Sequence, residues 1–321
     1  FYDGSPMYRG LQPLWEVAER EKLTALGTSA PFIHACMKAG LEPDSQFDLT
    51  NLKMIGSTAA PLSPEGFEWV YKNVKEDVWL NSASGGTDVM TGFVGGCPIL
   101  PVWAGEMQCR WLGVKVEAYN IEGKPVINEV GELVVELPMP SMPLYFWNDP
   151  KQEKYRETYF SVYPGVWRHG DYIMINSQTG GITFFGRSDA VLKPSGVRIG
   201  TAEIYNEVEK LNEIADSLAI GQEWQGDQRV ILFVKLAEGH HLTEALKAKI
   251  KKALRENASP RHVPALIMAV PDIPYTLNMK KVEMAVTNLI NGRPVMNRDA
   301  LINPESLDYY ESIRDKLQWS G

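Results

Sequence analysis

Hydroxyl, carboxylate and glycine residues suited to a phosphate and its metal ion gather in the segment 81–88, Asn-Ser-Ala-Ser-Gly-Gly-Thr-Asp. Its two glycines allow a phosphate to approach the backbone closely, while Thr87 offers a hydroxyl and Asp88 the hard oxygen that Mg²⁺ prefers. The segment follows an apolar run that predicts a buried strand, and α/β sheets bind ligands at the carboxyl ends of such strands. A plain strand-to-turn connection, with Asp88 capping a following helix, explains the spacing equally well.

Two further segments could contact a nucleotide or another anion. Asp171 follows a glycine at the start of a predicted strand, where a carboxylate can accept hydrogen bonds from two ribose hydroxyls, although an ordinary turn Asp is commoner. Arg187 could reach a ribose or phosphate, or simply pair with Asp189. The turn 193–198 could bind an anion through its backbone amides and Arg198, with a solvated turn as the more frequent alternative.

Two adjacent lysines, Lys280 and Lys281, end the loop that begins at Pro274. A lysine on such a loop can bring a point charge to a phosphate or carboxylate in an enclosed site. Most Lys-Lys pairs are only the solvated start of a helix, so the pair has two interpretations. The five histidines and three cysteines show no spacing typical of a catalytic triad or a metal site.

The elements that must position these segments change in type along the chain. Up to about residue 97, predicted helices and strands alternate, which indicates a parallel sheet. They are helices at 11–22, 29–40 and 63–74, and strands at 23–27, 52–55 and 78–80. Short strands and turns follow and predict a small β-barrel or meander, after which the alternation returns in an α+β module. We therefore expect an α/β protein with a domain at 1–188, including a β-barrel subdomain at about 100–188, and a smaller α+β domain at 189–321.

The composition limits the class of protein. Of 321 residues, 44% are hydrophobic and 22% charged, which is typical of a globular protein and not of a disordered one. The net charge of −8 argues against nucleic-acid binding, and no run approaches the roughly 18 apolar residues of a membrane helix. Three cysteines without a C-x-x-C pair argue against a disulfide framework and a zinc site. We therefore expect a cytoplasmic protein with small-molecule ligands and neither nucleic acid nor membrane as a partner.

Taken together and in order, these segments resemble the acyl- and aryl-CoA synthetases of the adenylate-forming superfamily, over nearly the whole chain. The segment 56–61, Gly-Ser-Thr-Ala-Ala-Pro, is similar to the family's adenine-lining segment, and 86–88 to its Thr-Glu motif with Asp in place of Glu. Residues 195–204 resemble the start of the mobile C-terminal domain. Lys280 falls where the family keeps its adenylating lysine, although Asn-Met at 278–279 departs from the usual Ser-Gly.

The resemblance implies ATP, Mg²⁺ and coenzyme A as cofactors, and a role for each matching residue. The implied ATP- or AMP-binding residues are Ala59, Ala60, Pro61, Ser84, Gly86, Thr87, Asp171, Arg187 and Arg198. The implied catalytic residues are Lys280, Thr87 and Asp88, the last also as the Mg²⁺ ligand. Asp189 is implied as the hinge, and Ser195, Gly196 and Arg255 as CoA-binding residues.

Four segments, 82–88, 259–264, 273–276 and 303–307, resemble the branch of the superfamily that activates acetoacetate. In the related acetate-activating enzymes a Trp two residues before the motif's Thr closes the acyl pocket, and here Gly85 holds that position. Removing an indole leaves room for a longer acid, so the resemblance implies an AMP-forming ligase that joins acetoacetate to CoA. Another short acid such as propionate or butyrate is an open alternative.

The family's Ser/Thr/Gly-rich phosphate loop, which ends in Lys, has no counterpart in the sequence. The opening residues 1–6, Phe-Tyr-Asp-Gly-Ser-Pro, resemble a segment just downstream of that loop. We therefore expect that the chain lacks an N-terminal half. A catalytically incompetent fragment that binds nucleotide or CoA weakly is the corresponding alternative function.

Overall fold

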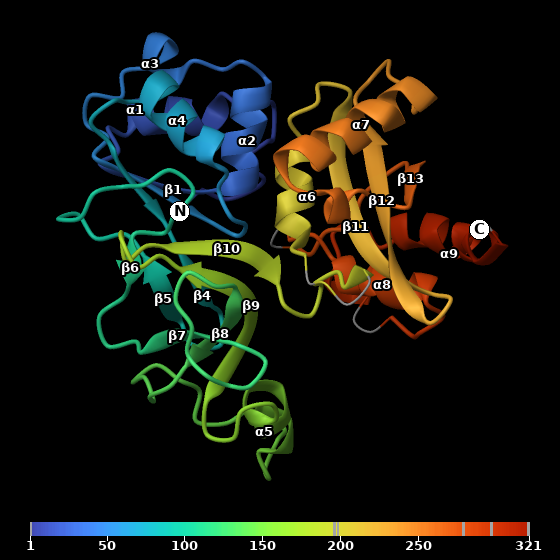
Figure 1. Ribbon diagram of the computed structural model, residues 1–321. Coiled ribbons are helices and arrows are strands. Elements are labelled where there is room, and N and C mark those ends of the chain that lie inside the picture. Colours follow the sequence, from blue (N-terminus) through green and yellow to red (C-terminus); the bar gives the residue numbers. More distant parts are fainter. Residues whose placement is uncertain (1, 195–196, 198, 278–279, 296–297, 320–321) are drawn as a thin grey trace. The chain divides into compact units, whose positions relative to one another are not determined.

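The computed structural model describes residues 2–194, 197, 199–277, 280–295 and 298–319. Its internal contacts divide the chain into two compact units, Phe1–Phe184 and Phe185–Gly321 (Figure 1). The boundary predicted from the sequence lies a few residues later, at 188/189.

The first unit begins with a parallel sheet in the order β1-β2-β3, as the alternation of elements predicts. Its strands are β1 Ala25–Ser29, β2 Met54–Thr58 and β3 Trp79–Ser82, and its helices are α1 Pro13–Arg20, α2 Ala30–Lys38, α3 Pro43–Gln46 and α4 Pro64–Asn73. Ser29 and Ser63 cap α2 and α4, because each hydroxyl accepts a hydrogen bond from a backbone N–H in the first turn. Trp15, Phe32 and Leu80 are fully buried between the helices and the sheet.

Two antiparallel sheets complete the first unit and share one apolar core. The smaller contains β4 Ser84–Gly86, β5 Thr91–Gly95 and β6 Cys109–Arg110. The larger has the order β10-β9-β8-β7 and contains β7 Val116–Tyr119, β8 Gly131–Val135, β9 Trp167–Ile175 and β10 Ile182–Arg187, and helix α5 Glu153–Phe160 precedes β9. Phe93, Leu133 and Trp167 are buried where these strands meet.

The second unit is a three-stranded sheet between two pairs of helices (Figure 1). Its elements are α6 Thr201–Val208, β11 Ile214–Trp224, β12 Asp227–Leu236, α7 Glu244–Asn257, β13 Leu266–Ala269, α8 Glu283–Ile290 and α9 Ser306–Trp319. Because side chains alternate along a strand, Ile231 and Phe233 pack with α8 and α9, while Leu232 packs with α6 and α7. Both faces of the sheet are therefore buried.

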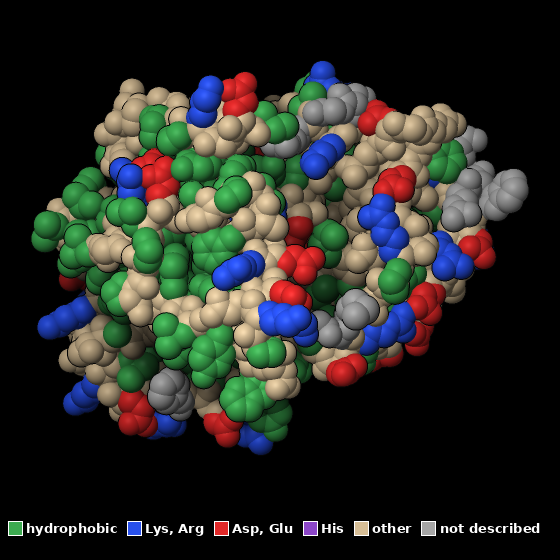
Figure 2. All heavy atoms as spheres, turned by 90° about the horizontal axis from the view of Figure 1, so that it is seen from below, with side chains coloured by type: hydrophobic (Ala, Val, Ile, Leu, Met, Phe, Trp, Pro, Cys, Tyr) green, Lys and Arg blue, Asp and Glu red, His purple; other side chains and the backbone are tan. Residues whose placement is uncertain are grey.

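On the face drawn in Figure 2, Lys and Arg side chains lie among Asp and Glu side chains, with hydrophobic side chains between them. Large exposed apolar side chains include Leu144 and Trp147, which lie between β8 and α5. Among the described residues, no helix has the length and apolar character needed to cross a bilayer.

Candidate active site

Two of the implied nucleotide-binding segments leave neighbouring strands of the parallel sheet. Strands β2 and β3 pair in parallel, with Gly56 opposite Asn81, and the Ala83 N–H donates to the Ser57 carbonyl at 3.0 Å. The segment 59–61 and the segment that starts at Ser84 therefore begin side by side, at the edge where α/β sheets bind ligands.

Ala59, the first residue after β2, adopts a backbone conformation that non-glycine residues rarely use. Its φ is +74°, in the left-handed region. Such strain persists where the surrounding structure enforces it, and it is concentrated at binding sites. Ala60 follows as an exposed residue and Pro61 is half-buried. The strained turn supports the implied nucleotide-binding role of this segment, which stays a prediction.

The segment 84–95 forms a β-hairpin that sequence reasoning missed. Strand β4 pairs antiparallel with β5, and the turn between them is closed by a hydrogen bond of 3.2 Å from Met90 N–H to the Thr87 carbonyl. Thr87 and Asp88 are exposed at this turn. The alternative in which Asp88 caps a following helix is wrong, because β5 follows the turn instead.

Gly85 lies where the two strands of this hairpin approach very closely. A Cβ atom at this position would lie 2.2 Å from the Thr91 carbonyl oxygen and 2.7 Å from Gly92 Cα. Both are backbone atoms, so neither can move aside cheaply. The hairpin itself thus requires glycine here, independently of any ligand. The assignment of Gly85 to an acyl pocket stays a prediction.

The Asp88 carboxylate is oriented by an aromatic residue of α5. Tyr159 Oη donates a hydrogen bond of 2.5 Å to Asp88 Oδ2, and the Tyr159 ring stacks on Trp167 at 3.5 Å. Among the described residues, no group of three or more His, Cys, Asp or Glu side chains could hold a metal. One exposed carboxylate beside a hydroxyl fits Mg²⁺, which proteins commonly bind through one or two carboxylates plus substrate phosphates.

Asp171 lies in a β-bulge that brings it near the β4–β5 hairpin. Strand β9 inserts extra residues opposite Leu133, and Gly170 takes a φ of +88° within this irregularity. Asp171 Oδ2 is 3.6 Å from His169 Nε2. The His169 ring in turn lies against Gly86, since a Cβ built on that glycine would be 3.0 Å from His169 Cε1. His169 therefore links two implied nucleotide-binding residues, a contact that the sequence analysis did not assign.

In the second unit, Arg187 and Asp189 form a two-pronged ion pair. Arg187 Nε and Nη2 lie 3.2 and 3.0 Å from the two Asp189 oxygens, and both side chains are nearly half exposed. The simple pairing that the sequence left open is thus present, and such exposed pairs contribute little to stability. The ribose-binding and hinge roles of these residues stay predictions.

The implied CoA-binding residues are only partly covered by the structure. Ser195 and Gly196, together with the nucleotide-binding candidate Arg198, lie outside the described residues. Leu192 and Ile199, which flank them in the sequence, form an isolated antiparallel bridge. Arg255 is exposed in the last turn of α7. These assignments remain predictions.

The two adjacent lysines occupy opposite environments on one hairpin. We call the segments 274–277 and 280–282 the lysine hairpin, because Tyr275 and Lys281 form an antiparallel bridge and Thr276 N–H donates to the Lys280 carbonyl at 2.9 Å. Neighbouring side chains on a strand point to opposite faces. Lys280 is exposed, whereas the Lys281 side chain is only 17% exposed. The solvated-pair interpretation is therefore wrong for Lys281.

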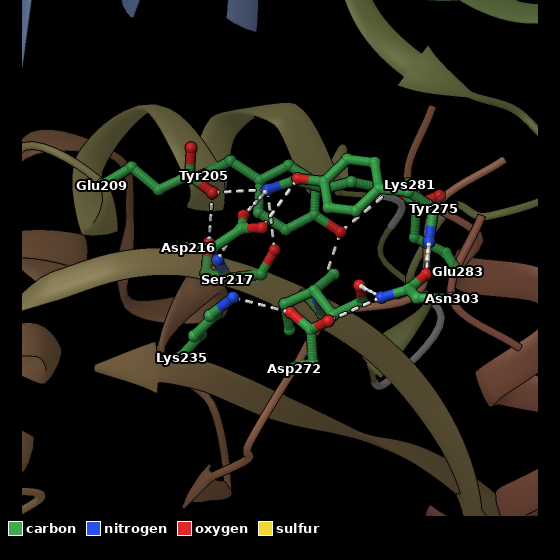
Figure 3. A network of polar contacts seen from close by, with 12 residues as sticks. Tyr205, Glu209, Asp216, Ser217, Lys235, Asp272, Tyr275, Lys281, Glu283 and Asn303 are labelled. Carbon is green, nitrogen blue, oxygen red and sulfur yellow. Dashed lines mark hydrogen bonds and ion pairs between the residues drawn. The ribbon is translucent and has the colours of Figure 1, made fainter. Parts of the chain in front are cut away.

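Lys281 is enclosed by acidic and aromatic groups (Figure 3). Its Nζ lies 2.5 Å from Glu209 Oε1 and 2.8 Å from Asp216 Oδ1, donates to the Ser217 carbonyl at 2.7 Å, and sits 4.1 Å from the centre of the Tyr205 ring. Burial alone would lower the pKa of Lys281, but the two carboxylates hold it well above its usual value. Lys281 is thus a charged structural lysine, which leaves Lys280 as the lysine available to a ligand.

Comparisons with known proteins identify clear relatives of the chain, although no protein-family model matches it. The acetoacetyl-coenzyme A synthetase of Rhizobium meliloti (strain 1021) is 52% identical over 314 residues, which make up 98% of this chain and 48% of that protein. The acetoacetyl-CoA synthetase of Xenopus tropicalis is 48% identical over 313 residues, 97% of this chain and 47% of that protein. The chain spans about half the length of the curated relatives that it matches.

Solved structures of similar proteins superpose on the chain. The acetoacetyl-CoA synthetase from Streptomyces lividans superposes with a TM-score of 0.90 at 44% identity, covering 98% of this chain and 49% of that one. An anthranilate CoA ligase in complex with anthranoyl-AMP superposes with a TM-score of 0.73 at 20% identity, covering 88% and 52%. At 20% identity the likeness shows the fold alone. Together the two superpositions confirm the α/β fold expected from the sequence.

Proposed function

The chain is homologous to the acetoacetyl-CoA synthetases of the adenylate-forming superfamily, and on that premise we propose that the protein activates acetoacetate with ATP and transfers it to CoA. The observation that carries this proposal is the 44–52% identity to such enzymes over 98% of the chain. The described geometry supports it: the strand-edge turn at Ala59, the hairpin tip at Asp88 and the bulge at Asp171 all lie in one unit.

In the first half-reaction, an acetoacetate oxygen attacks the α-phosphorus of ATP, which gives acetoacetyl-AMP and pyrophosphate. Asp171 would accept the ribose hydroxyls, and the segment 59–61 would line the adenine. Thr87 and Asp88, exposed at the hairpin turn, would hold the phosphates and the metal ion. When bound there, Mg²⁺ would neutralise phosphate charge. Lys280 would stabilise the charge that develops between carboxylate and phosphate.

In the second half-reaction, the CoA thiol attacks the acetoacetyl carbonyl and AMP leaves. We assign Ser195, Gly196 and Arg255 to CoA and Asp189 to the hinge on which the second unit would turn between half-reactions. Hinge closure of this kind is a recognised mode of conformational switching. Lys280 would be needed only before the second unit rotates. Adenylation should therefore depend on Lys280, and thioester formation should not.

The experiment separates the half-reactions in the full protein. Lys280→Ala is expected to slow acetoacetate-dependent ATP–pyrophosphate exchange by about 100- to 1,000-fold, the usual loss for one charge-stabilising group. Thioester formation from supplied acetoacetyl-AMP should be spared. Lys252→Ala, which removes another exposed lysine of the second unit, is the matched control and should leave both half-reactions unchanged. Equal loss of both half-reactions in Lys280→Ala would contradict the assignment.

Acid specificity is tested separately. Pyrophosphate exchange should be fastest with acetoacetate, and equal rates with propionate and butyrate would remove the acetoacetate claim. A binding role without turnover is the second candidate function. Calorimetry of the 321-residue chain with AMP and with CoA tests it, since binding without exchange activity would support that role.

We also propose that the protein works in the cytosol. Its three cysteines are all free thiols, which suits a reducing compartment. Cell fractionation with an antibody to the protein tests this localisation, and recovery from a membrane or secreted fraction would contradict it.

A further inference from the structure

The two strands of the lysine hairpin are fixed to a single carboxylate on β11. Tyr275 Oη donates a hydrogen bond of 2.7 Å to Asp216 Oδ2, and Lys281 Nζ lies 2.8 Å from Asp216 Oδ1 (Figure 3). Tyr275 and Lys281 form the antiparallel bridge of the hairpin. Residues directly opposite in such a bridge project to the same face, so both side chains reach inward to Asp216.

Further contacts hold the inward face in place. Glu209 Oε1 lies 2.5 Å from Lys281 Nζ and accepts a hydrogen bond of 2.7 Å from Ser217 Oγ. On the other strand, Tyr275 N–H donates to Asn303 Oδ1 at 3.0 Å. The charged Lys281 and the neutral Tyr275 therefore both have hydrogen-bond partners, as a buried polar network requires.

The inward anchoring determines where Lys280 points. Lys280 is the immediate neighbour of Lys281, so its side chain must leave the opposite face of the hairpin. The hairpin also closes through Lys280 itself, since its N–H donates to Thr276 Oγ1 at 3.2 Å and its carbonyl accepts from the Thr276 N–H. The Lys280 side chain has a fixed direction only if the bridge between Tyr275 and Lys281 cannot twist or slip.

We propose that Asp216 is a positioning residue that directs Lys280 toward the reacting groups, acting through Tyr275 and Lys281. This inference rests on the proposed function of Lys280. It adds Asp216, Tyr275 and Lys281 as three residues that act without contact to substrate. The buried polar network fixes the direction of the Lys280 side chain. The lysine stem is flexible, so its orientation must come from the backbone that carries it. The adenylation step should therefore depend on the network, and the thioester step should not.

The test uses Tyr275→Phe in the full protein, because this change removes one hydroxyl and keeps the ring. Tyr309→Phe is the matched control, since Tyr309 donates a hydrogen bond of 3.2 Å to the Ala269 carbonyl in the same unit. Acetoacetate-dependent pyrophosphate exchange should slow by about tenfold in Tyr275→Phe, the effect of one lost hydrogen bond to a charged group. Thioester formation from acetoacetyl-AMP should be unchanged, and Tyr309→Phe should alter neither.

Hydrogen exchange supplies a readout that does not depend on activity. The amide of Thr276, bonded to the Lys280 carbonyl, should exchange faster in Tyr275→Phe and at the wild-type rate in Tyr309→Phe. Asp216→Asn removes the charge that faces Lys281 and should produce larger changes of the same kind.

The outcomes separate this inference from the proposed function. Unchanged Thr276 exchange in Tyr275→Phe, or equal loss of both half-reactions, would overturn the positioning role. A wild-type protein without acetoacetate-dependent exchange would instead contradict the proposed function. In that case faster Thr276 exchange in Tyr275→Phe still supports the anchoring by Asp216, and unchanged exchange rejects it.

Discussion

Tyr275 and Lys281 face each other across an antiparallel bridge, and their side chains reach different oxygens of the same Asp216 carboxylate. The next residue, Lys280, is exposed. Two adjacent lysines therefore have different roles in the structure: Lys281 is a buried cation paired with carboxylates, and Lys280 is an exposed charge at the surface of its unit. Substitution of Lys281 should therefore lower stability, whereas substitution of Lys280 should leave stability nearly unchanged and slow adenylation directly.

The stability consequence can be measured directly. Lys281→Met should lower the free energy of unfolding by about 3–5 kcal/mol, because it leaves the Glu209 and Asp216 carboxylates partly buried without their cation. Lys280→Ala should change it by less than about 0.5 kcal/mol, as is usual for an exposed side chain. Urea unfolding of both variants beside the wild type tests the contrast. Similar midpoints for the two variants would show that Lys281 is not a structural cation.

A second prediction concerns the hairpin at Gly85. Gly85→Ala would place a Cβ 2.2 Å from the Thr91 carbonyl oxygen, so the strands must separate and stability should fall by about 1–3 kcal/mol, a typical cost of overpacking. Gly27→Ala in β1 is the matched control, because a Cβ there meets nothing within 4 Å. The control should be neutral or slightly stabilising. Thermal unfolding of both variants measures the difference, and an unperturbed Gly85→Ala would refute the close approach.

Much of the fold could be predicted because its signals are local. Ser29 and Ser63 precede helices that they cap, and apolar runs mark β2 and β3. The extent of β11 could not, since the strand reaches from Ile214 to Trp224, well beyond its apolar run at 218–220. Polar residues such as Asp216 lie within it and interrupt the apolar run. That Asp216 faces Lys281, far along the chain, is decided by packing alone.

The candidate site was predictable to a similar degree. The expectation that the segment 81–88 starts at the carboxyl end of a buried strand is met, because β3 ends at Ser82 and pairs in parallel with β2. The β4–β5 hairpin was missed because β4 consists of Ser84 and two glycines, which carry no apolar alternation. The contact of His169 with Gly86 depends on a bulge, and a bulge changes pairing without a clear signature in composition.

Thiol reactivity provides a third prediction. Burial raises the pKa of Cys36 to about 11, and its side chain is fully buried. Since the thiolate is the reactive form, Cys36 should resist iodoacetamide at pH 8 in the folded protein, while the partly exposed Cys97 is alkylated. Mass spectrometry of tryptic peptides identifies the labelled positions. In denaturant Cys36 should label as readily as Cys97, and prompt labelling of Cys36 before unfolding would contradict its burial.

Tyr119 should make the protein sensitive to alkaline pH. Burial, together with the nearby Glu136 carboxylate, raises the pKa of Tyr119 from 10.0 to about 12, and its Oη donates to Glu136 Oε1 at 2.6 Å. Between these two pH values the unfolded chain loses the phenol proton and the folded chain keeps it. The free energy of unfolding must therefore fall as pH rises through this window, since the folded state binds more protons.

Tyr119→Phe removes this contribution, so its unfolding free energy should fall less steeply than that of the wild type between about pH 10 and 12. Below that window the variant should be the less stable of the two, because it lacks the hydrogen bond to Glu136. Other tyrosines, such as the partly buried Tyr71, also have raised pKa values, but they are common to both proteins and cancel in the difference. Tyr145→Phe, a change at an exposed side chain, should keep the wild-type slope. Parallel slopes for Tyr119→Phe and the wild type, measured by urea unfolding at each pH, would show that Glu136 and burial do not retain the Tyr119 proton.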